Sequence, residues 1–383
     1  MLDFSEIISN PLIVVVLAVL VLSFLYLFLY YGLFYFRVAN YRLGKKDNIV
    51  SDASGSSRPS VSVVVTAHND SELLKKSLVY LLEQDYDNYE VVVVNYVSQD
   101  DTKFVLRVCS ENYPCLKVVN FPEDVNMFQG KKYPLSLGIK SAQNDIIICT
   151  DPECVPQSFN WLGEMVRQFS KETNIVLGYS GIVKEKGMFN ALQQYDNITR
   201  YARCLGSAIC GMPYTGNGHN LAFRRSFFFE AKGFISHYSE PEGADDLFVN
   251  KNATRINTSV SLHPDSFVMV DPEQNVKDWM QKRKRRFAPL YLHSKGEIFL
   301  RSLFPLSLFL FYLSIAIAFI FSWMYWQIPL LALLLKCMWQ CWASRSLFAR
   351  FDVKNQFWMA PLFELYFLLS DTILSTISLI RKR

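Results

Sequence analysis

A long apolar run near the N-terminus constrains this chain more than any other feature. From Leu12 to Phe36 it has no charged side chain and few polar ones. At about 1.5 Å per residue, a helix of this length crosses a hydrocarbon core of about 30 Å. The run is too long and too aromatic for the core of a signal peptide, and no small-residue cleavage site follows it. We therefore predict an uncleaved membrane anchor within an N-terminal segment of residues 1–46.

The charges that flank this run indicate its orientation. Acidic residues precede it and basic residues follow it: Asp3 and Glu6, then Arg37, Arg42, Lys45 and Lys46. Because basic residues collect on the cytoplasmic side of membrane helices, we expect the N-terminus outside and the following chain in the cytoplasm. The eight cysteines include no CxxC pair, which is typical of reduced thiols in that compartment.

A second apolar region covers residues 299–383. Two of its segments, Ser302 to Tyr325 and Phe357 to Ile380, are long enough to span a membrane, and Pro329 to Trp342 is only marginally so. We therefore expect two or three C-terminal helices in a multi-pass protein of the cell membrane. Whether the last segment spans or lies in the interface stays open, because a crossing would place the basic C-terminal residues outside.

Charged side chains interrupt these apolar segments at Lys336, Glu364 and Asp371. A charge inside a membrane is costly, so it either marks a pathway or is paired with a neighbour. Of the two interpretations, we favour pairing between helices together with snorkelling toward the interface.

The stretch between the apolar regions has the pattern of a globular domain, residues 59–298, after a Ser-, Asp- and Gly-rich linker at residues 47–58. Strand patterns alternate with helix patterns in its first half. The expected strands are Val61–Thr66, Tyr89–Asn95, Leu116–Asn120 and Asp145–Thr150, and the expected helices are Ser71–Gln84, Thr102–Asn112 and Pro134–Gln143. This alternation predicts an α/β fold with a mostly parallel sheet and helices on its faces.

The first of these helices carries both a start signal and an apolar face. Asp70 or Ser71 is expected to cap its N-terminus. Its inner face is expected to consist of Leu73, Leu74, Leu78, Leu81 and Leu82.

Polar side chains follow three of the predicted strands where each strand ends. They are His68, Asn69 and Asp70, then Asn95, Tyr96 and Ser98, then Asp151 and Glu153. In parallel sheets, ligands bind beyond the carboxyl ends of the strands. Asp151 and Glu153 straddle Pro152 and can point at one spot, and hard carboxylate oxygens suit Mg²⁺ or Mn²⁺, which in turn holds a diphosphate.

Six segments in order resemble the family 2 glycosyltransferases, which have a GT-A fold. They are PSVSVVVTAHNDSE, VVVVNYVSQDDT, GKKYPLSLGIKSAQNDIIICTDPECVP, TGNGHNLAFRR followed by KGF, GADDLFVN and WMQKRKRRF. The resemblance runs from about Pro59 to Pro289. The anchor at one end and the apolar tail at the other are similar to the membrane-anchored branch of that family.

The resemblance implies an inverting sugar transfer that uses a nucleotide-sugar donor and a divalent metal, Mg²⁺ or Mn²⁺. Asp151 and Glu153 would hold the metal. The implied nucleotide-sugar contacts are Asp70, Asn95, Lys131, Lys132, Gln281, Arg285 and Arg286. Because the domain is expected to be tethered to the membrane, we expect a lipid-linked or membrane-near acceptor, as in the synthesis of a cell-envelope glycan or glycolipid.

The position of the catalytic base depends on the register chosen. Counted from Leu247 the base position is Ala244, and counted from the acidic pair it is Asp245. We favour Asp245 as the base and Asp246 as a cap for a helix beginning near Leu247. Where the family carries an acidic residue after the second strand, this chain has Asn95 and Tyr96. The alternative function is therefore a catalytically inactive membrane scaffold or partner subunit that kept the fold.

The net charge of +4 is too small to indicate nucleic-acid binding. The basic run from Lys282 to Arg286 also suits anionic lipid headgroups. The expected partners are thus a nucleotide-sugar donor, a lipid-linked or glycan acceptor and membrane lipid. The globular domain is expected to face the cytoplasm.

Overall fold

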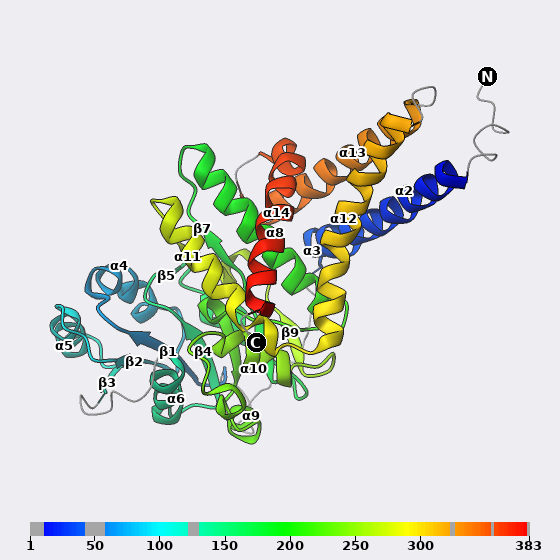
Figure 1. The fold of residues 1–383 in the computed structure, drawn as a ribbon. Helices are drawn as coiled ribbons and strands as arrows, with labels where there is room; N and C mark the ends of the chain where they lie inside the picture. Colours follow the sequence, from blue (N-terminus) through cyan, green and yellow to red (C-terminus); the bar gives the residue numbers. More distant parts are fainter. Residues whose placement is uncertain (1–10, 43–57, 122–129, 322–325, 354–355, 381–383) are drawn as a thin grey trace. The chain divides into compact units, whose positions relative to one another are not determined.

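The computed structural model describes residues 11–42, 58–121, 130–321, 326–353 and 356–380 (Figure 1). The expected linker, apart from its last residue, and the terminal basic residues 381–383 lie outside the described residues. Internal contacts divide the chain into two compact units. The apolar unit consists of Met1–Asn40, Gly187–Gly206 and Leu290–Arg383, and the sheet unit consists of Tyr41–Lys186 and Ser207–Pro289.

A seven-stranded sheet forms the centre of the sheet unit, in the order β3-β2-β1-β4-β8-β6-β9 (Figure 1). Its strands are β1 (Val61–Ala67), β2 (Tyr89–Asn95), β3 (Leu116–Asn120), β4 (Ile146–Thr150), β6 (Ile175–Leu177), β8 (Leu221–Arg224) and β9 (Thr258–Val260). The four strands β3-β2-β1-β4 are parallel, and β8 runs antiparallel to β4 and β6. The predicted α/β fold with a mostly parallel sheet is confirmed.

A smaller sheet has the order β5-β10-β7. Its strands are β5 (Cys154–Pro156), β7 (Ser180–Ile182) and β10 (Val268–Val270). The helical elements of the sheet unit are α4 (Ser71–Leu82), α5 (Thr102–Asn112), α6 (Lys132–Ser141), α7 (Trp161–Val166), η2 (Gly218–Asn220), α9 (Arg225–Glu230), η3 (Ile235–His237), α10 (Ala244–Asn252), η4 (Pro264–Ser266) and α11 (Val276–Phe287).

The β-branched runs of β1 and β2 are buried on both faces, because alternate side chains of a strand point to opposite sides. Val63 and Val65 join the core that contains Leu74 and Leu78 of α4. The other face carries α6, which packs on β1 and β2. Gly138 permits this close approach, since a Cβ there would lie 2.6 Å from a methyl group of Val64.

Two expectations for α4 were wrong. Leu73 is 37% exposed instead of facing the core. The carboxylate of Asp70 accepts a hydrogen bond from the His68 amide and does not cap the helix. The first-turn amide of Ser71 donates instead to Asp100 Oδ2 at 3.0 Å, so a residue from the next loop caps α4.

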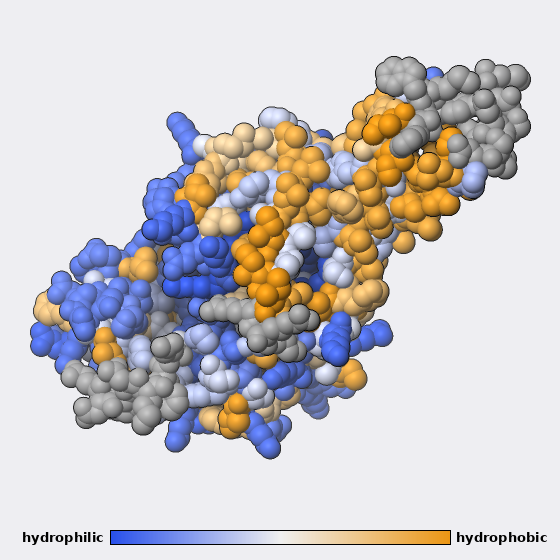
Figure 2. All heavy atoms as spheres, viewed as in Figure 1, coloured by the Kyte–Doolittle hydropathy of each residue, from blue (hydrophilic) through white to orange (hydrophobic). Residues whose placement is uncertain are grey.

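The apolar unit is helical. Its elements are α2 (Pro11–Tyr30), η1 (Tyr31–Phe36), α3 (Arg37–Ala39), most of α8 (Met188–Ile209), α12 (Lys295–Phe321), α13 (Gln327–Arg350), η7 (Phe357–Met359) and α14 (Ala360–Ile380), and η5 (Ala288–Leu292) connects to it. Three stretches are long and apolar enough to cross a membrane: Pro11–Ala39, Lys295–Ile320 and Phe357–Ile380. Figure 2 shows hydrophobic side chains over much of the visible surface of α2 and α12.

Two of the charges inside the apolar segments, Lys336 and Glu364, are paired, as we favoured from the sequence. Lys336 and Glu364 are 2% and 4% exposed, and the ammonium group contacts the carboxylate. Lys336 Nζ also donates to Gln340 Oε1 at 2.7 Å and to the Tyr312 hydroxyl at 3.1 Å. The Tyr31 hydroxyl donates to Glu364. One polar cluster thereby links η1, α12, α13 and α14.

The α8 segment of the apolar unit contributes an aromatic contact. The ring of Tyr195 lies 5.4 Å from that of Phe363 and 5.8 Å from that of Phe367, measured between centroids. These rings are buried, so α8 shares a core with α14 within this unit.

Candidate active site

The acidic residues Asp151 and Glu153 directly follow β4, at the end where the parallel strands of the sheet all finish. The amide of Cys154 donates to the Asp151 carbonyl at 3.0 Å, which closes a tight turn and holds both carboxylates beyond the strand. Thr150 Oγ1 donates to the carbonyl of His219 at 3.0 Å and so fixes η2 beside this turn. The structure thus places Asp151 and Glu153 just beyond the end of a strand, as we predicted.

Lys131 joins this turn to α10. Its Nζ lies 3.1 Å from Asp151 Oδ2 and 3.4 Å from Asp245 Oδ2. Burial opposes ionisation of Asp151, but the charges of Lys131 and His219 outweigh it and hold the pKa of the Asp151 carboxyl below its usual value. Burial also opposes the charge of Lys131, but the two carboxylates raise the pKa of Lys131 well above its usual range. The ammonium group of Lys131 therefore lies between two carboxylates, those of Asp151 and Asp245.

Two further residues, His219 and Lys282, contact the acidic pair. Neither was among the site residues that we predicted from the sequence. His219 Nε2 lies 3.5 Å from Asp151 Oδ2 and 3.4 Å from Glu153 Oε1. Lys282 Nζ lies 2.8 Å from Glu153 Oε2 and 2.6 Å from Glu273 Oε1. His219 belongs to the segment TGNGHNLAFRR, in which the strand begins two residues later at Leu221. Lys282 belongs to the basic run of residues 282–286, and the helical phase of α11 decides which of these side chains reaches Glu153.

The neighbouring carboxylates of α10 point to different partners. Asp245 is directed at η2, where a Cβ on Gly218 would lie 2.1 Å from Asp245 Oδ2. Asp246 accepts a hydrogen bond from the hydroxyl of Thr215. The helix begins at Ala244, earlier than expected near Leu247, and its N-cap is Gly243 with a φ of 75°. Asp246 therefore lies in the first turn and is not the N-cap that we expected.

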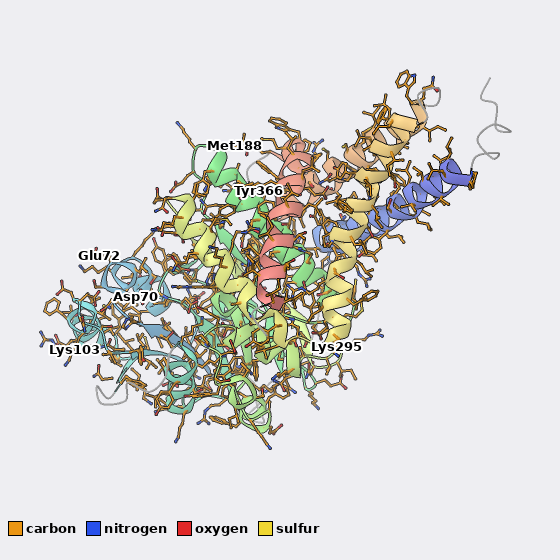
Figure 3. The ribbon with its side chains drawn as sticks, viewed as in Figure 1. Asp70, Glu72, Lys103, Met188, Lys295 and Tyr366 are labelled. Atoms are coloured by element: carbon orange, nitrogen blue, oxygen red, sulfur yellow. The ribbon has the colours of Figure 1, made fainter. Side chains whose placement is uncertain are left out.

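Asp70, labelled in Figure 3, lies in the loop after β1, and hydrogen bonds tie this loop to the loop after β2. The Asn69 amide donates to Ser98 Oγ at 3.0 Å, and the Gln99 amide donates to Asn69 Oδ1 at 2.7 Å. Burial raises the pKa of Asp70. Asn95, at the end of β2, is 6% exposed, and its Oδ1 has no hydrogen-bond partner among the described residues.

Lys132 does not take the place expected for a phosphate or ribose contact. It is 2% exposed, and its Nζ donates to the carbonyls of His237, Glu240 and Glu242 at 2.7, 2.6 and 3.0 Å. Burial lowers the pKa of Lys132 to about 8, so at pH 7 the ammonium form with three donors prevails. Backbone carbonyls of residues 237–242 thus take all three donors of the ammonium group, in place of a ligand.

The three site residues expected from α11 are Gln281, Arg285 and Arg286, and the structure places them in different surroundings. Gln281 is exposed. Arg285 is 60% exposed and its Nε lies 3.7 Å from Glu242 Oε1, while the guanidinium of Arg286 lies 5.9 Å from the ring centroid of Phe287. Lys282 makes the contact that ties α11 to Glu153.

The residues at the turn after β4 fit a divalent cation by their chemistry. In the described part of the chain, no group of three or more His, Cys, Asp or Glu side chains is placed to hold a metal by itself. Mg²⁺ in phosphate-handling sites typically takes one or two carboxylates and completes its shell with phosphate and water. Asp151 and Glu153 supply those carboxylates, and the ammonium group of Lys131 beside Asp151 shows that this spot attracts positive charge.

Comparison with known proteins gives a consistent result. Residues 62–230 match the model of the family described as Glycosyl transferase family 2. A poly-beta-1,6-N-acetyl-D-glucosamine synthase of Staphylococcus aureus is 29% identical over 124 residues, which are 32% of this chain and 28% of that protein. Glycosyltransferase AglE of Haloferax volcanii is 30% identical over 146 residues, which are 38% of this chain and 46% of that protein. The chain thus spans less than half of either relative.

Among solved structures, a mannosyltransferase of Pyrobaculum calidifontis, in complex with GDP-Man and Mn²⁺, has the same fold. The two structures agree with a TM-score of 0.57 at 21% sequence identity, over 89% of this chain and 98% of that one.

Proposed function

We propose that this chain, whose residues 62–230 match the glycosyl transferase family 2 model, is a membrane-anchored inverting glycosyltransferase. It moves a sugar from a nucleotide-sugar donor to a lipid-linked or membrane-near glycan acceptor, in the synthesis of a cell-envelope glycan or glycolipid. The two curated relatives, a polysaccharide synthase and a glycosyltransferase, support this reaction class. The Pyrobaculum neighbour was solved with the kind of donor and metal that we propose here.

One observation carries the proposal. Asp151 and Asp245, from segments far apart in the sequence, lie within 3.4 Å of the same ammonium group at the carboxyl ends of the parallel strands. Half-buried acids gathered around a single cation are typical of functional sites, where charged groups of perturbed pKa concentrate.

We assign roles by what each side chain touches. Asp245 accepts the proton of the acceptor hydroxyl as its oxygen attacks the anomeric carbon, and the nucleotide diphosphate leaves from the opposite face, which inverts the centre. A divalent cation bound by Asp151 and Glu153 supplies Lewis-acid stabilisation of the diphosphate charge. Lys131 and Lys282, already paired with these acids, add positive charge on the leaving-group side.

We place the nucleotide beside Asp70 and Asn95. Asp70 follows β1 and Asn95 is the last residue of β2, and the side-chain oxygen Oδ1 of Asn95 is buried without a partner among the described residues. A buried acceptor of this kind costs free energy until a donor reaches it. A base N–H group is such a donor.

We propose that the membrane holds this domain on the cytoplasmic side of the cell membrane. Three helices are long and apolar enough to span, and Glu364 of the last one is paired with Lys336 of α13. The flanking charges of the first helix give the orientation. The expected domain division, a 59–298 transfer domain between an N-terminal anchor and a C-terminal membrane region, stays part of this proposal.

The decisive experiment is a donor screen. The full chain, purified in detergent, is incubated with Mn²⁺ and a panel of nucleotide sugars, and release of the nucleoside diphosphate is measured. We expect release with one donor class and none from the Asp245→Asn variant. If the unmutated chain releases nothing from any donor, with or without membrane lipid acceptors, the alternative holds: a scaffold that kept the fold, as the replacement of an acidic residue by Asn95 would allow.

A further inference from the structure

The segment that leads into α10 lacks regular structure of its own. Between η3 and Ala244 the Glu240 amide donates to the His237 carbonyl at 3.2 Å, and the chain then turns at Gly243 with a φ of 75°. Asp245 is the second residue of α10, two positions after Gly243. The direction of its carboxylate therefore depends on what holds residues 237–243 in place.

Lys132 supplies that support from another part of the chain. An ammonium group has three donors, and all three donate to carbonyls of this segment, from His237, Glu240 and Glu242. The side chain is 2% exposed. One charged group thus binds three carbonyls of this segment at once, which fixes their relative positions.

The two residues before Lys132 contact the same part of the chain. Gly130, with a φ of 93°, lies so close that a Cβ would fall 2.4 Å from the carbonyl oxygen of Pro241. Lys131 Nζ is 3.4 Å from Asp245 Oδ2. Three consecutive residues therefore bind the loop backbone and the carboxylate beyond it.

We propose that Lys132 is a positioning residue for Asp245: by holding the carbonyls of the 237–243 segment, it sets the first turn of α10 so that the Asp245 carboxylate meets the site. The proposal rests on the proposed function, because it assumes that Asp245 takes part in transfer. It also assigns neighbouring lysines to different tasks. Lys131 contacts the acidic residues of the site, and Lys132 acts only through the loop.

The test compares Lys132→Met with Lys140→Met in the full chain. Lys140 lies on the same helix with an exposed side chain, so it is the matched control. Hydrogen–deuterium exchange reports the loop, calorimetry with UDP and GDP in Mn²⁺ reports nucleotide binding, and steady-state kinetics report transfer. For Lys132→Met we expect exchange in residues 237–247 to rise roughly tenfold or more, kcat to fall by a similar factor, and donor KM and nucleotide affinity to change by less than about twofold. Lys140→Met should match the unmutated chain.

Unchanged exchange in residues 237–247 would overturn the proposal, and so would equal losses of nucleotide affinity and kcat, which would make Lys132 a direct ligand of the donor. If Lys132→Met does not fold, Gly130→Ala decides. It keeps the lysine but drives a methyl group into the Pro241 carbonyl, and faster exchange of the same residues is required. Absence of transfer by the unmutated chain would contradict the proposed function alone, since the exchange measurement still tests the tether.

Discussion

Two neighbouring carboxylates, Asp245 and Asp246, differ in what they touch. The Asp245 carboxylate lies 3.4 Å from Lys131 Nζ, which also contacts Asp151, and the Asp246 carboxylate accepts a hydrogen bond from the Thr215 hydroxyl. We expect Asp245→Asn to lower turnover by roughly 10² or more with donor binding intact, since an amide cannot take the proton. Asp246→Asn should retain turnover and lose about 1 kcal/mol of stability. Steady-state kinetics and thermal unfolding of both variants check this, and the reverse pattern would move the base to Asp246.

Asp151 should govern metal-dependent nucleotide binding. We expect Asp151→Ala to weaken binding of the preferred nucleoside diphosphate in Mn²⁺ by more than tenfold, or more than about 1.4 kcal/mol, because the cation loses a carboxylate. Calorimetry with and without Mn²⁺ measures the effect. Asp87→Ala, at an exposed acidic position after α4, is the control. Equal affinities for the Asp151 variant and the control would remove the metal assignment.

Which site residues could be predicted depended on how far away their partners are in the sequence. Asp151 and Glu153 followed from a local pattern, an apolar strand ending in two acids. The role of Lys132 could not be predicted, because its partners lie 105 to 110 positions away and are backbone carbonyls, which carry no sequence signal. Lys282 pairs with Glu153 over 129 positions, and only the helical phase of α11 selects it from the basic run.

At the scale of elements, Asp100 links two helix starts. Its carboxylate accepts from the amide of Ser71 at 3.0 Å and from that of Thr102 at 3.1 Å, so it serves both α4 and α5. We expect Asp100→Ala to cost about 1 kcal/mol, the usual effect of losing a cap. Asp101→Ala is the control, because Asp101 precedes α5 without a side-chain capping bond. Thermal unfolding in detergent at pH 7 measures both variants.

This effect of Asp100 should depend on pH with a defined sign. Its hydrogen bonds with Thr102 and Ser71 outweigh the effect of desolvation and hold the pKa of the Asp100 carboxyl below its usual value. A carboxyl with a depressed folded-state pKa stabilises above its unfolded pKa of about 4, and this contribution fades as the pH falls toward the folded-state pKa. The stability gap between the unmutated chain and Asp100→Ala should therefore narrow below about pH 4. A gap that widens in acid would contradict the assignment.

The pair between α13 and α14 should behave as a unit. Lys336→Met leaves the Glu364 carboxylate buried without its cation, and we expect a loss of about 3–5 kcal/mol. The double variant Lys336→Met, Glu364→Leu removes both charges and should recover most of that loss. Thermal unfolding in detergent micelles compares the two. A double variant no more stable than the single one would show that the cluster contributes more than charge neutralisation.

Elements were predictable where the pattern was long. The expected strand Tyr89–Asn95 and helix Thr102–Asn112 coincide with β2 and α5, because β-branched runs and apolar periodicity extend over several residues there. The three-residue strands of the smaller sheet were not predicted, since so short a run has no detectable period. The π-helical turn η1 inside the anchor was also not predicted, because it occurs within an unbroken apolar run.

At the scale of the whole molecule, the orientation in the membrane is testable. From the flanking charges we expect Ser57 inside the cell and Asp3 outside. In a cysteine-free background, Ser57→Cys should resist a membrane-impermeant maleimide added to intact cells, and Asp3→Cys should react with it. Permeabilised cells should label at both positions. Strong labelling of Ser57→Cys in intact cells would reverse the topology.

The division of the chain into two units has a consequence for inheritance and for handling the protein. The region that matches the family, residues 62–230, contains residues 187–206, which belong to the unit of the apolar helices. A gene fragment coding only for residues 59–298 would leave Tyr195 without the rings of Phe363 and Phe367 and would expose that aromatic surface to aggregation. Recombination between relatives would meet the same obstacle, because no single pair of breakpoints moves one unit without cutting into the other. We therefore expect the two units to be inherited together.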